Sequence, residues 1–122
     1  MGDTPPEQSI EVNISQRTID DALQGSNVDQ KTIATEGLRI VAMVLDKNSD
    51  YGGSAYKTPA LAGHLTAWDA MLCRASDKVA RIDNLQRGQA GKVDEAIEDT
   101  IRDLAGYCIL LLGYMANNGG PE

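Results

Sequence analysis

Apolar side chains in the last third of the chain recur at intervals of three and four residues between Val93 and Met115. This spacing places them on one side of an α-helix, because consecutive residues of a helix are about 100° apart. After Asp94, the apolar pattern is interrupted by four further acids, Glu95, Glu98, Asp99 and Asp103. The segment is therefore predicted to be a helix with one buried face and carboxylates beside it. The predicted buried face consists of Ile97, Ile101, Leu104, Cys108, Leu111 and Met115.

Two earlier segments, Asp29 to Lys47 and Leu65 to Gln86, show the same periodicity. Alternation of apolar and polar residues, which is typical of a half-buried strand, is scarce after Ile14. We therefore predict an all-α fold: a small bundle of three long helices, with a short N-terminal helix that opens at Ser15. The residues predicted to face the core are Ile33, Gly37, Ile40, Met43 and Val44 in the first segment and Leu65, Trp68, Leu72, Ala75, Val79 and Ile82 in the second.

The 122 residues are enough for one domain. We expect a disordered N-terminus over 1–9, a single α-helical domain over 10–116 and a flexible tail over 117–122. The connection from Asn48 to Gly63 is longer than most loops, which favours a functional role for it. Three helices with broad apolar faces bury those faces poorly alone, so association into a homo-oligomer is expected to complete the bundle.

The chain is acidic, with a formal net charge of -7 at pH 7. General nucleic-acid binding is therefore not expected, since phosphate backbones require a basic surface. The longest apolar run, Cys108 to Leu112, is too short to span a bilayer. We expect a cytoplasmic protein, in the host cytosol if a phage encodes it, and therefore reduced thiols at Cys73 and Cys108.

The acids of the last helix need an explanation. Asp94 is expected to cap the helix, and acids in the first turns suit the positive end of the helix dipole. Asp99 and Asp103 are less well explained, because they lie beyond the first turn and near the edge of the predicted apolar face. A partly desolvated carboxylate needs a cation. That cation is either a basic side chain or a magnesium ion, and the sequence leaves both readings open.

Three basic residues, Arg74, Lys78 and Arg81, align on the middle helix at spacings of four and three. One interpretation is a solvated flank whose cations pair with Asp77 or with acids on the neighbouring helix. The other is phosphate recognition by cations that a rigid helix holds in place. Spacing alone does not choose between the two.

Three motifs taken together resemble a known family. They are Lys47-Asn48-Ser49-Asp50-Tyr51-Gly52, the segment from Arg74 to Ile82, and the segment from Glu95 to Tyr107. Their order and spacing resemble the phage and bacterial family called nucleotide modification associated domain, first type, over about Leu38 to Tyr114. That family is thought to serve phage nucleotide metabolism. It is similar to the all-α nucleotide pyrophosphohydrolases of the MazG and dUTPase type, in which carboxylates on two adjacent helices bind magnesium and a nucleoside triphosphate is cleaved between its α and β phosphates.

The middle helix departs from that pattern, because it offers three cations where the pyrophosphohydrolases have glutamates. Two functions stay open: a magnesium-dependent nucleoside triphosphate pyrophosphohydrolase, and a non-catalytic sponge that sequesters a cyclic or modified nucleotide immune signal as an anti-defence protein. A purely structural bundle is the third. The site residues assigned on this resemblance are Lys47, Asn48, Asp50, Tyr51, Arg74, Lys78, Arg81 and Tyr107 for nucleotide binding, Asp99 and Asp103 for catalysis, and Glu95, Asp99 and Asp103 for magnesium.

Overall fold

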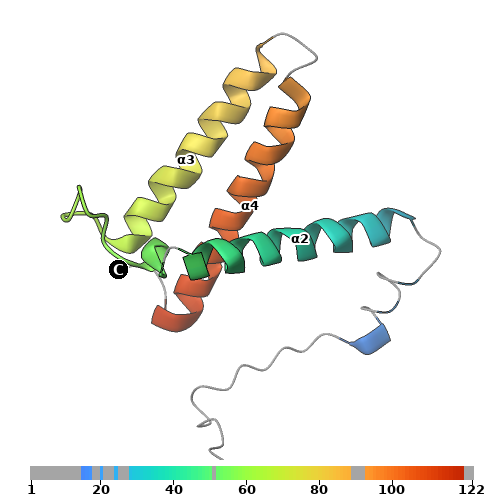
Figure 1. Cartoon of the computed structure of the whole chain (residues 1–122), viewed down its shortest axis with the longest axis horizontal. Coiled ribbons are helices and arrows are strands. Elements are labelled where there is room, and N and C mark those ends of the chain that lie inside the picture. The colour runs from blue at the N-terminus through green and yellow to red at the C-terminus, as the bar shows by residue number, and fades with distance from the viewer. Residues whose placement is uncertain are drawn as a thin grey trace, which may run out of the picture. The chain divides into compact units, whose positions relative to one another are not determined.

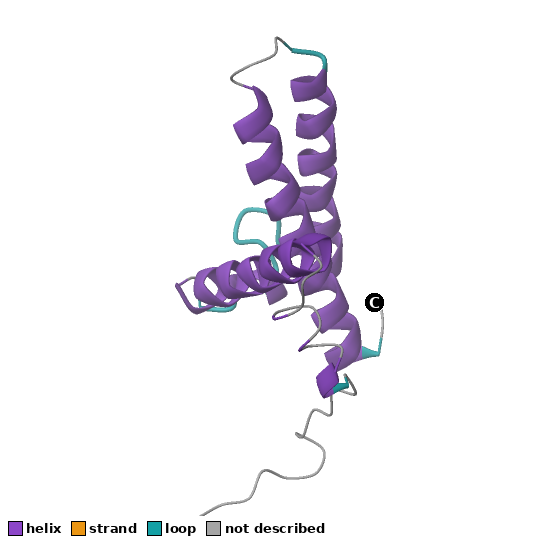
Figure 2. Cartoon of the chain, turned by 90° about the vertical axis from the view of Figure 1, so that its right-hand side faces the viewer, coloured by secondary structure: helices purple, strands orange, loops and turns teal. Residues whose placement is uncertain are grey.

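The computed structural model describes residues 15–17, 20, 24, 28–50, 52–88 and 93–119. Within these ranges all regular structure is helical and no residue lies in a strand, as Figures 1 and 2 show. The predicted all-α class and the three long helices are confirmed. Most of the expected N-terminal helix lies outside the described residues. The elements are α2 (Val28–Asp50), the short 3-10 helix η2 (Ser54–Tyr56), α3 (Ala67–Gln86) and α4 (Val93–Asn118).

The chain divides into two units between Glu36 and Gly37, a boundary that falls within α2. In the first unit, Ile33 was predicted to face the core, but it is exposed. The second unit, Gly37–Glu122, contains the end of α2 together with η2, α3 and α4. All that follows concerns this second unit.

Helix α2 continues three residues beyond its predicted end at Lys47 and stops at Asp50. Two consecutive glycines follow shortly afterwards in the left-handed region, with φ of 61° at Gly52 and 75° at Gly53. Residues with a side chain rarely adopt this conformation, so it favours glycine. The Gly53 amide donates to the Asn48 carbonyl at 3.0 Å. The first family motif therefore begins on the last turn of a helix and not in a loop.

Helix α3 begins two residues later than predicted and ends at Gln86 as predicted. Its N-cap is Thr66, whose side-chain oxygen accepts a hydrogen bond from the Asp69 amide at 3.0 Å. Such a cap satisfies one of the backbone amides that the first turn leaves without a helical partner.

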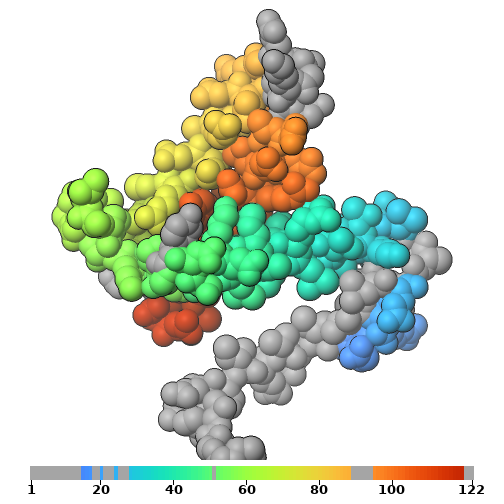
Figure 3. Space-filling view, viewed as in Figure 1, coloured from blue at the N-terminus to red at the C-terminus, as the bar shows by residue number. Residues whose placement is uncertain are grey.

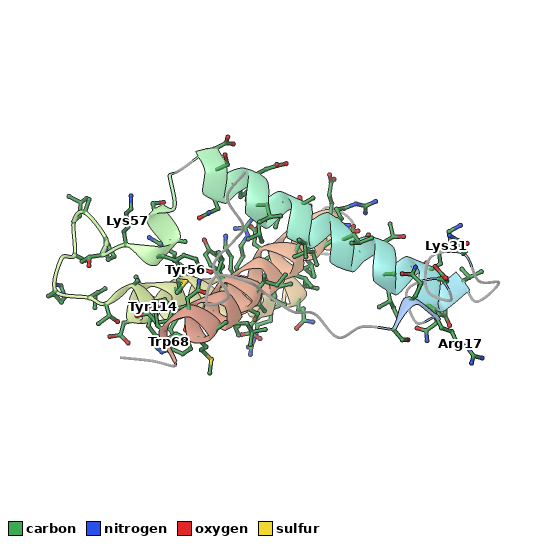
Figure 4. The ribbon with its side chains drawn as sticks, turned by 90° about the horizontal axis from the view of Figure 1, so that it is seen from below. Arg17, Lys31, Tyr56, Lys57, Trp68 and Tyr114 are labelled. Atoms are coloured by element: carbon green, nitrogen blue, oxygen red, sulfur yellow. The ribbon has the colours of Figure 1, made fainter. Side chains whose placement is uncertain are left out.

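Helices α3 and α4 lie side by side and run antiparallel (Figures 1 and 2). The core between them contains Ala67, Met71 and Tyr114, with Met71 fully buried. Aromatic rings extend this core toward the loop, because the Tyr114 ring lies 5.8 Å from that of Trp68 and 6.1 Å from that of Tyr56 between centroids (Figure 4).

The buried faces of α3 and α4 are the predicted ones only in part: Leu104 and Leu111 on α4 and Trp68 and Ile82 on α3 are half-buried, as predicted. On α4, Ile101, Cys108 and Met115 are exposed, whereas Thr100 and Gly106 are buried. On α3, Leu72 and Val79 are exposed, whereas Ala67, Ala70 and Met71 are buried. Several buried positions, Ala67, Ala70, Thr100 and Gly106 among them, hold small side chains, which a search for bulky apolar residues overlooks. In α2 the prediction is correct for Val44, which is buried, and for Ile40 and Met43, which are half-buried.

The ends of α4 also differ from the prediction. The helix begins at Val93, so Asp94 lies inside the first turn and is not the cap. It continues past Met115 to Asn118, and Gly119 follows with a φ of 76°. The Gly119 amide donates to the Met115 carbonyl at 2.8 Å, which closes the helix.

Two sequence-based exclusions can be compared with the structure. Within the described residues, each helix is too short or too polar to pass through a lipid bilayer. Cys73 and Cys108 are both free thiols at exposed positions, as predicted.

Tyr56 connects the loop to α4. Its hydroxyl donates to the Leu110 carbonyl at 2.9 Å, and partial burial raises the pKa of the phenol above its usual value of 10.0. The hydroxyl lies over Gly113: a β-carbon at that glycine would be 2.6 Å from the Tyr56 oxygen. A side chain at position 113 therefore competes for space with this hydrogen bond.

Gly113→Ala is expected to destabilise the protein by about 1–3 kcal/mol, because the new methyl group displaces the Tyr56 hydroxyl. In a Tyr56→Phe background the same substitution is expected to stabilise by about 0.5–1 kcal/mol, since the oxygen is gone and alanine is favoured inside a helix. Urea unfolding of the wild type, the two single variants and the double variant measures both values.

Gly37→Ala is the matched control, because nothing lies within 4 Å of a β-carbon at that helical glycine. It is expected to stabilise both backgrounds equally. An equal stabilisation by Gly113→Ala in both backgrounds would contradict this account of Tyr56.

Candidate functional site

A cleft of about 370 Å³ lies where the last turns of α2, the loop at η2, α3 and α4 meet. In Figure 3 the green surface of the end of α2 meets the orange surface of α4. The polar part of the cleft contains six of the predicted site residues, which come from three helices. They are Lys47 and Asn48 on α2, Arg74 and Lys78 on α3, and Asp103 and Tyr107 on α4.

The apolar wall of the cleft depends on Gly106. A β-carbon there would lie 3.1 Å from Cγ2 of Val44 and 3.4 Å from Cε of Met43. The first distance is tighter than ordinary van der Waals contact, so the glycine allows α2 to approach α4 closely. This contact positions the end of α2, and with it Lys47 and Asn48, at the rim of the cleft.

Asp103 is the carboxylate of the cleft and is paired with two lysines. Lys78 Nζ lies 3.3 Å from its Oδ2 atom, and Lys47 Nζ lies 3.7 Å from its Oδ1 atom. The side chains of Asp103 and Lys78 are about 30% exposed, whereas that of Lys47 is 57% exposed. The expectation that the α4 acid lies at a partly buried border beside a cation is confirmed. Each ion pair links α4 to a different helix.

The cleft carries more positive than negative charge. Arg74 lies one helical turn before Lys78, and Tyr107 lies one turn after Asp103. Because α3 and α4 are antiparallel, both residues lie on the loop side of the Lys78–Asp103 pair. Three cationic side chains and one carboxylate line this space, in a chain whose net charge is -7. A surplus of two positive charges in a recess attracts an anion.

Asn48 contributes a buried acceptor. Its Oδ1 atom is shielded from solvent and accepts no hydrogen bond within the described residues. A buried polar atom left unpaired costs about 1–3 kcal/mol. Such an atom calls for an explanation. Because it has no exposed surface, a ligand in the cleft donates to it only after the Asn48 side chain turns toward the cleft.

Two predicted site residues, the basic Arg81 and the acidic Asp99, lie beside the cleft and not in it. Arg81 lies further along α3, where its Nε donates to the Thr100 hydroxyl oxygen at 3.3 Å. Thr100 is buried and donates in turn to the Ala96 carbonyl at 2.6 Å. Arg81 therefore connects α3 to α4. Asp99 accepts from Arg102 at 3.4 Å on the exposed side of α4.

Two of the remaining predicted residues do not line this cleft, and a third lies outside the described residues. Glu95 and Asp50 are exposed and do not line it. Tyr51 lies outside the described residues.

The residues proposed for magnesium are not gathered around one point. Glu95, Asp99 and Asp103 succeed one another on a single helix, so the first and last are about 12 Å apart along its axis. Within the described ranges, no group of three or more His, Cys, Asp or Glu side chains is arranged to hold a metal ion. The oxygens of Asp103 face ammonium groups. The three carboxylates by themselves do not fit a complete magnesium site.

Sequence reasoning missed the residues that shape the cleft. Ser54 and Ala55 of η2, and Gly106 and Leu110 of α4, also line it. Glycine inside an apolar helical segment is a signal of close packing that could have identified Gly106. No sequence pattern indicated η2, because its three residues are too few for a periodicity.

One comparison with known proteins is informative. The profile of the family described as "Nucleotide modification associated domain 1" matches residues 47–113. No curated protein and no solved structure matches the chain. The matched range begins at Lys47 and includes every polar side chain of the cleft.

Proposed function

The chain belongs to the nucleotide modification associated domain 1 family, and on this premise we propose that its cleft binds the phosphate group of a nucleotide. The observation that carries the proposal is the local charge. Lys47, Arg74 and Lys78 face one recess in which Asp103 is the carboxylate. A recess of this charge in an acidic protein selects small anions over nucleic acid, because the surrounding surface repels a long phosphate backbone.

The three cations have different parts in this proposal. Arg74 and Lys78 lie one turn apart on α3, so both heads reach the same phosphate from a rigid element. Asp103 holds the ammonium groups of Lys78 and Lys47 near one another before the ligand arrives. Little side-chain freedom then remains to be lost on binding, which strengthens it.

Tyr107 and Asn48 are proposed to contact the base or sugar. Tyr107 presents a half-buried ring, and aromatic rings stack on nucleobases. A protein that binds free nucleotides in this way is proposed to act in the cytoplasm, where they are present.

Capture without hydrolysis is the version that the side chains favour, because the Asp103 oxygens are already ion-paired with two ammonium groups. Magnesium-dependent hydrolysis of a triphosphate is the alternative. In that case magnesium would enter on the nucleotide phosphates, as this ion often does, with Asp103 as the protein carboxylate nearest to them.

Lys78→Met is expected to weaken nucleotide binding by about ten- to a hundredfold, the usual value of a hydrogen bond to a charged group. The methionine keeps most of the apolar stem of the side chain, so the core contacts are retained. Isothermal titration calorimetry with each canonical deoxynucleotide, with and without magnesium, measures the effect.

Lys57→Met is the matched control for this experiment. Lys57 is exposed and lies outside the cleft, yet its removal changes the net charge equally (Figure 4). The affinity of the Lys57→Met variant for the nucleotide is expected to stay within about twofold of the wild-type value. Equal losses in the two lysine variants would mean that binding depends on overall charge and not on this cleft.

Asp103→Asn separates capture from magnesium-dependent hydrolysis. In the capture version, the repulsion between the Asp103 carboxylate and the phosphate outweighs its positioning of the lysines, so removal of this charge is expected to raise phosphate affinity by about two- to fivefold. Asp77→Asn, an exposed change on α3 with the same charge difference, serves as the control. Turnover of a triphosphate by the wild type that disappears in Asp103→Asn would support hydrolysis and contradict capture.

We also propose that two copies associate through α4. Ile101, Ala105, Cys108, Leu112 and Met115 follow one another at spacings of four, three, four and three, the repeat that two packed helices share. Ile101, Leu112 and Met115 are 50%, 66% and 42% exposed. A second copy offers the same repeat, and a two-fold axis buries both at once.

Leu112→Glu is expected to convert such a dimer into a monomer, because it places a charge in the middle of the apolar repeat. Light scattering on the eluate of a size-exclusion column gives the mass directly. Leu61→Glu, at a fully exposed loop position, is expected to leave the dimer intact. A wild-type chain that elutes with the mass of one copy would rule out this association.

A further inference from the structure

Three features of the cleft bear on which class of nucleotide it takes: its net charge, its size and the unpaired oxygen of Asn48. We propose that the ligand is a nucleoside monophosphate, bound as a metal-free dianion, with a donor of its base or sugar on Asn48 Oδ1. This inference rests on the proposed function of the cleft and narrows it to one phosphorylation state.

The charge of the cleft matches one phosphate monoester. Each Asp103 oxygen faces one ammonium group, at 3.3 and 3.7 Å, so the carboxylate offsets one of the three cations. Two positive charges remain. A phosphate monoester carries about 1.5 to 2 negative charges at pH 7 and has three acceptor oxygens. A triphosphate brings more negative charge than these side chains neutralise, and a cyclic phosphodiester brings less.

The size of the cleft points to a single nucleotide. Its volume of about 370 Å³ is near the lower end of the roughly 300–1,000 Å³ that ligand sites occupy. Lys78 and Asp103 mark one end of its polar lining, and Arg74 and Tyr107 follow one turn closer to the loop. One phosphate beside Lys78 and Arg74 leaves room for one base near Tyr107.

Asn48 adds a requirement for a donor. Its Oδ1 atom is buried beside the cleft and accepts nothing from the described residues. The Asn48 carbonyl accepts from the Gly53 amide at 3.0 Å, which holds the end of α2 against the loop. In the proposed complex the Asn48 side chain turns toward the cleft, where an N–H of a base or an O–H of a sugar supplies the missing hydrogen bond. Inorganic phosphate at pH 7 occupies the cations without reaching it. Asn48 is therefore a specificity residue that separates nucleotides from free phosphate.

Calorimetry on the full chain tests this directly. The probes are the four deoxynucleoside 5′-monophosphates, the matching triphosphates with magnesium or with EDTA, the 3′,5′-cyclic monophosphates and inorganic phosphate. We expect at least one monophosphate to bind equally well with magnesium and with EDTA. Its cyclic counterpart, with one charge fewer, is expected to bind about tenfold more weakly.

Asn48→Leu is the variant for the base or sugar contact. It is expected to weaken binding of the monophosphate by about tenfold, the value of one hydrogen bond, and to leave the affinity for inorganic phosphate unchanged. Its melting temperature is expected to equal or exceed that of the wild type, because an unpaired buried oxygen is removed. Asn48→Ser, which is smaller, is expected to lose the same selectivity, and it replaces the leucine variant if that one folds poorly.

The outcomes separate this inference from the proposed function. Two results overturn the monophosphate inference and leave nucleotide binding in place. One is a triphosphate with magnesium that binds tenfold more tightly than the monophosphate, and the other is a cyclic phosphate that binds as well as the monophosphate. Equal losses of nucleotide and inorganic phosphate in Asn48→Leu overturn the role of Asn48. Absence of binding by every nucleotide overturns both proposals.

Discussion

Two glycines of α4 determine how closely the other segments approach that helix. At Gly106 a side chain would press on Val44 of α2, and at Gly113 it would collide with the hydroxyl of Tyr56. The end of α2 and the loop at η2 are the two walls of the cleft that do not belong to the α3–α4 pair. The cleft therefore exists because α4 is bare at these two points. The core of Met71 and Tyr114 holds α3 and α4 together. The two glycines leave room on α4 for the end of α2 and for Tyr56 of η2.

Asp103 shows how a single carboxylate can organise such a site without being its chemical centre. It lies on α4 and faces an ammonium group from α2 and another from α3. Exposed ion pairs of this kind stabilise a fold by at most about 1 kcal/mol each. Their importance lies in position, because they hold the ammonium groups of Lys47 and Lys78 near one another. The surplus of positive charge attracts a nearby anion. Under the proposed function, the acid near the core edge marks a phosphate site more directly than a metal site.

The sequence predicted the number and type of the long helices and the end of α3. Apolar residues at spacings of three and four identify a helix even when the wrong face of it is taken as buried. The sequence predicted the buried faces only in part. Leu72, Val79 and Ile101 are bulky and in register, yet they are exposed, whereas the small residues Ala70, Thr100 and Gly106 are buried. Small residues give a weak signal in an apolar pattern, so their burial is not read from the sequence. The predicted cations Arg74 and Lys78 do share a cleft with Asp103, because α3 and α4 are antiparallel neighbours. Arg81, in the same row, is instead joined to Thr100, and only the three-dimensional contact distinguishes it.

The central claim is that the cations of α2 and α3 bind the phosphate of a nucleotide in the cleft beside Asp103. The most direct measurement is a crystal structure of the chain with a nucleotide. It is predicted to show the phosphate within hydrogen-bonding distance of Lys78 Nζ and the Arg74 guanidinium, with Lys78 still paired to Asp103. A nucleotide bound elsewhere, or a magnesium ion on Asp103 with both lysines displaced, would contradict the account.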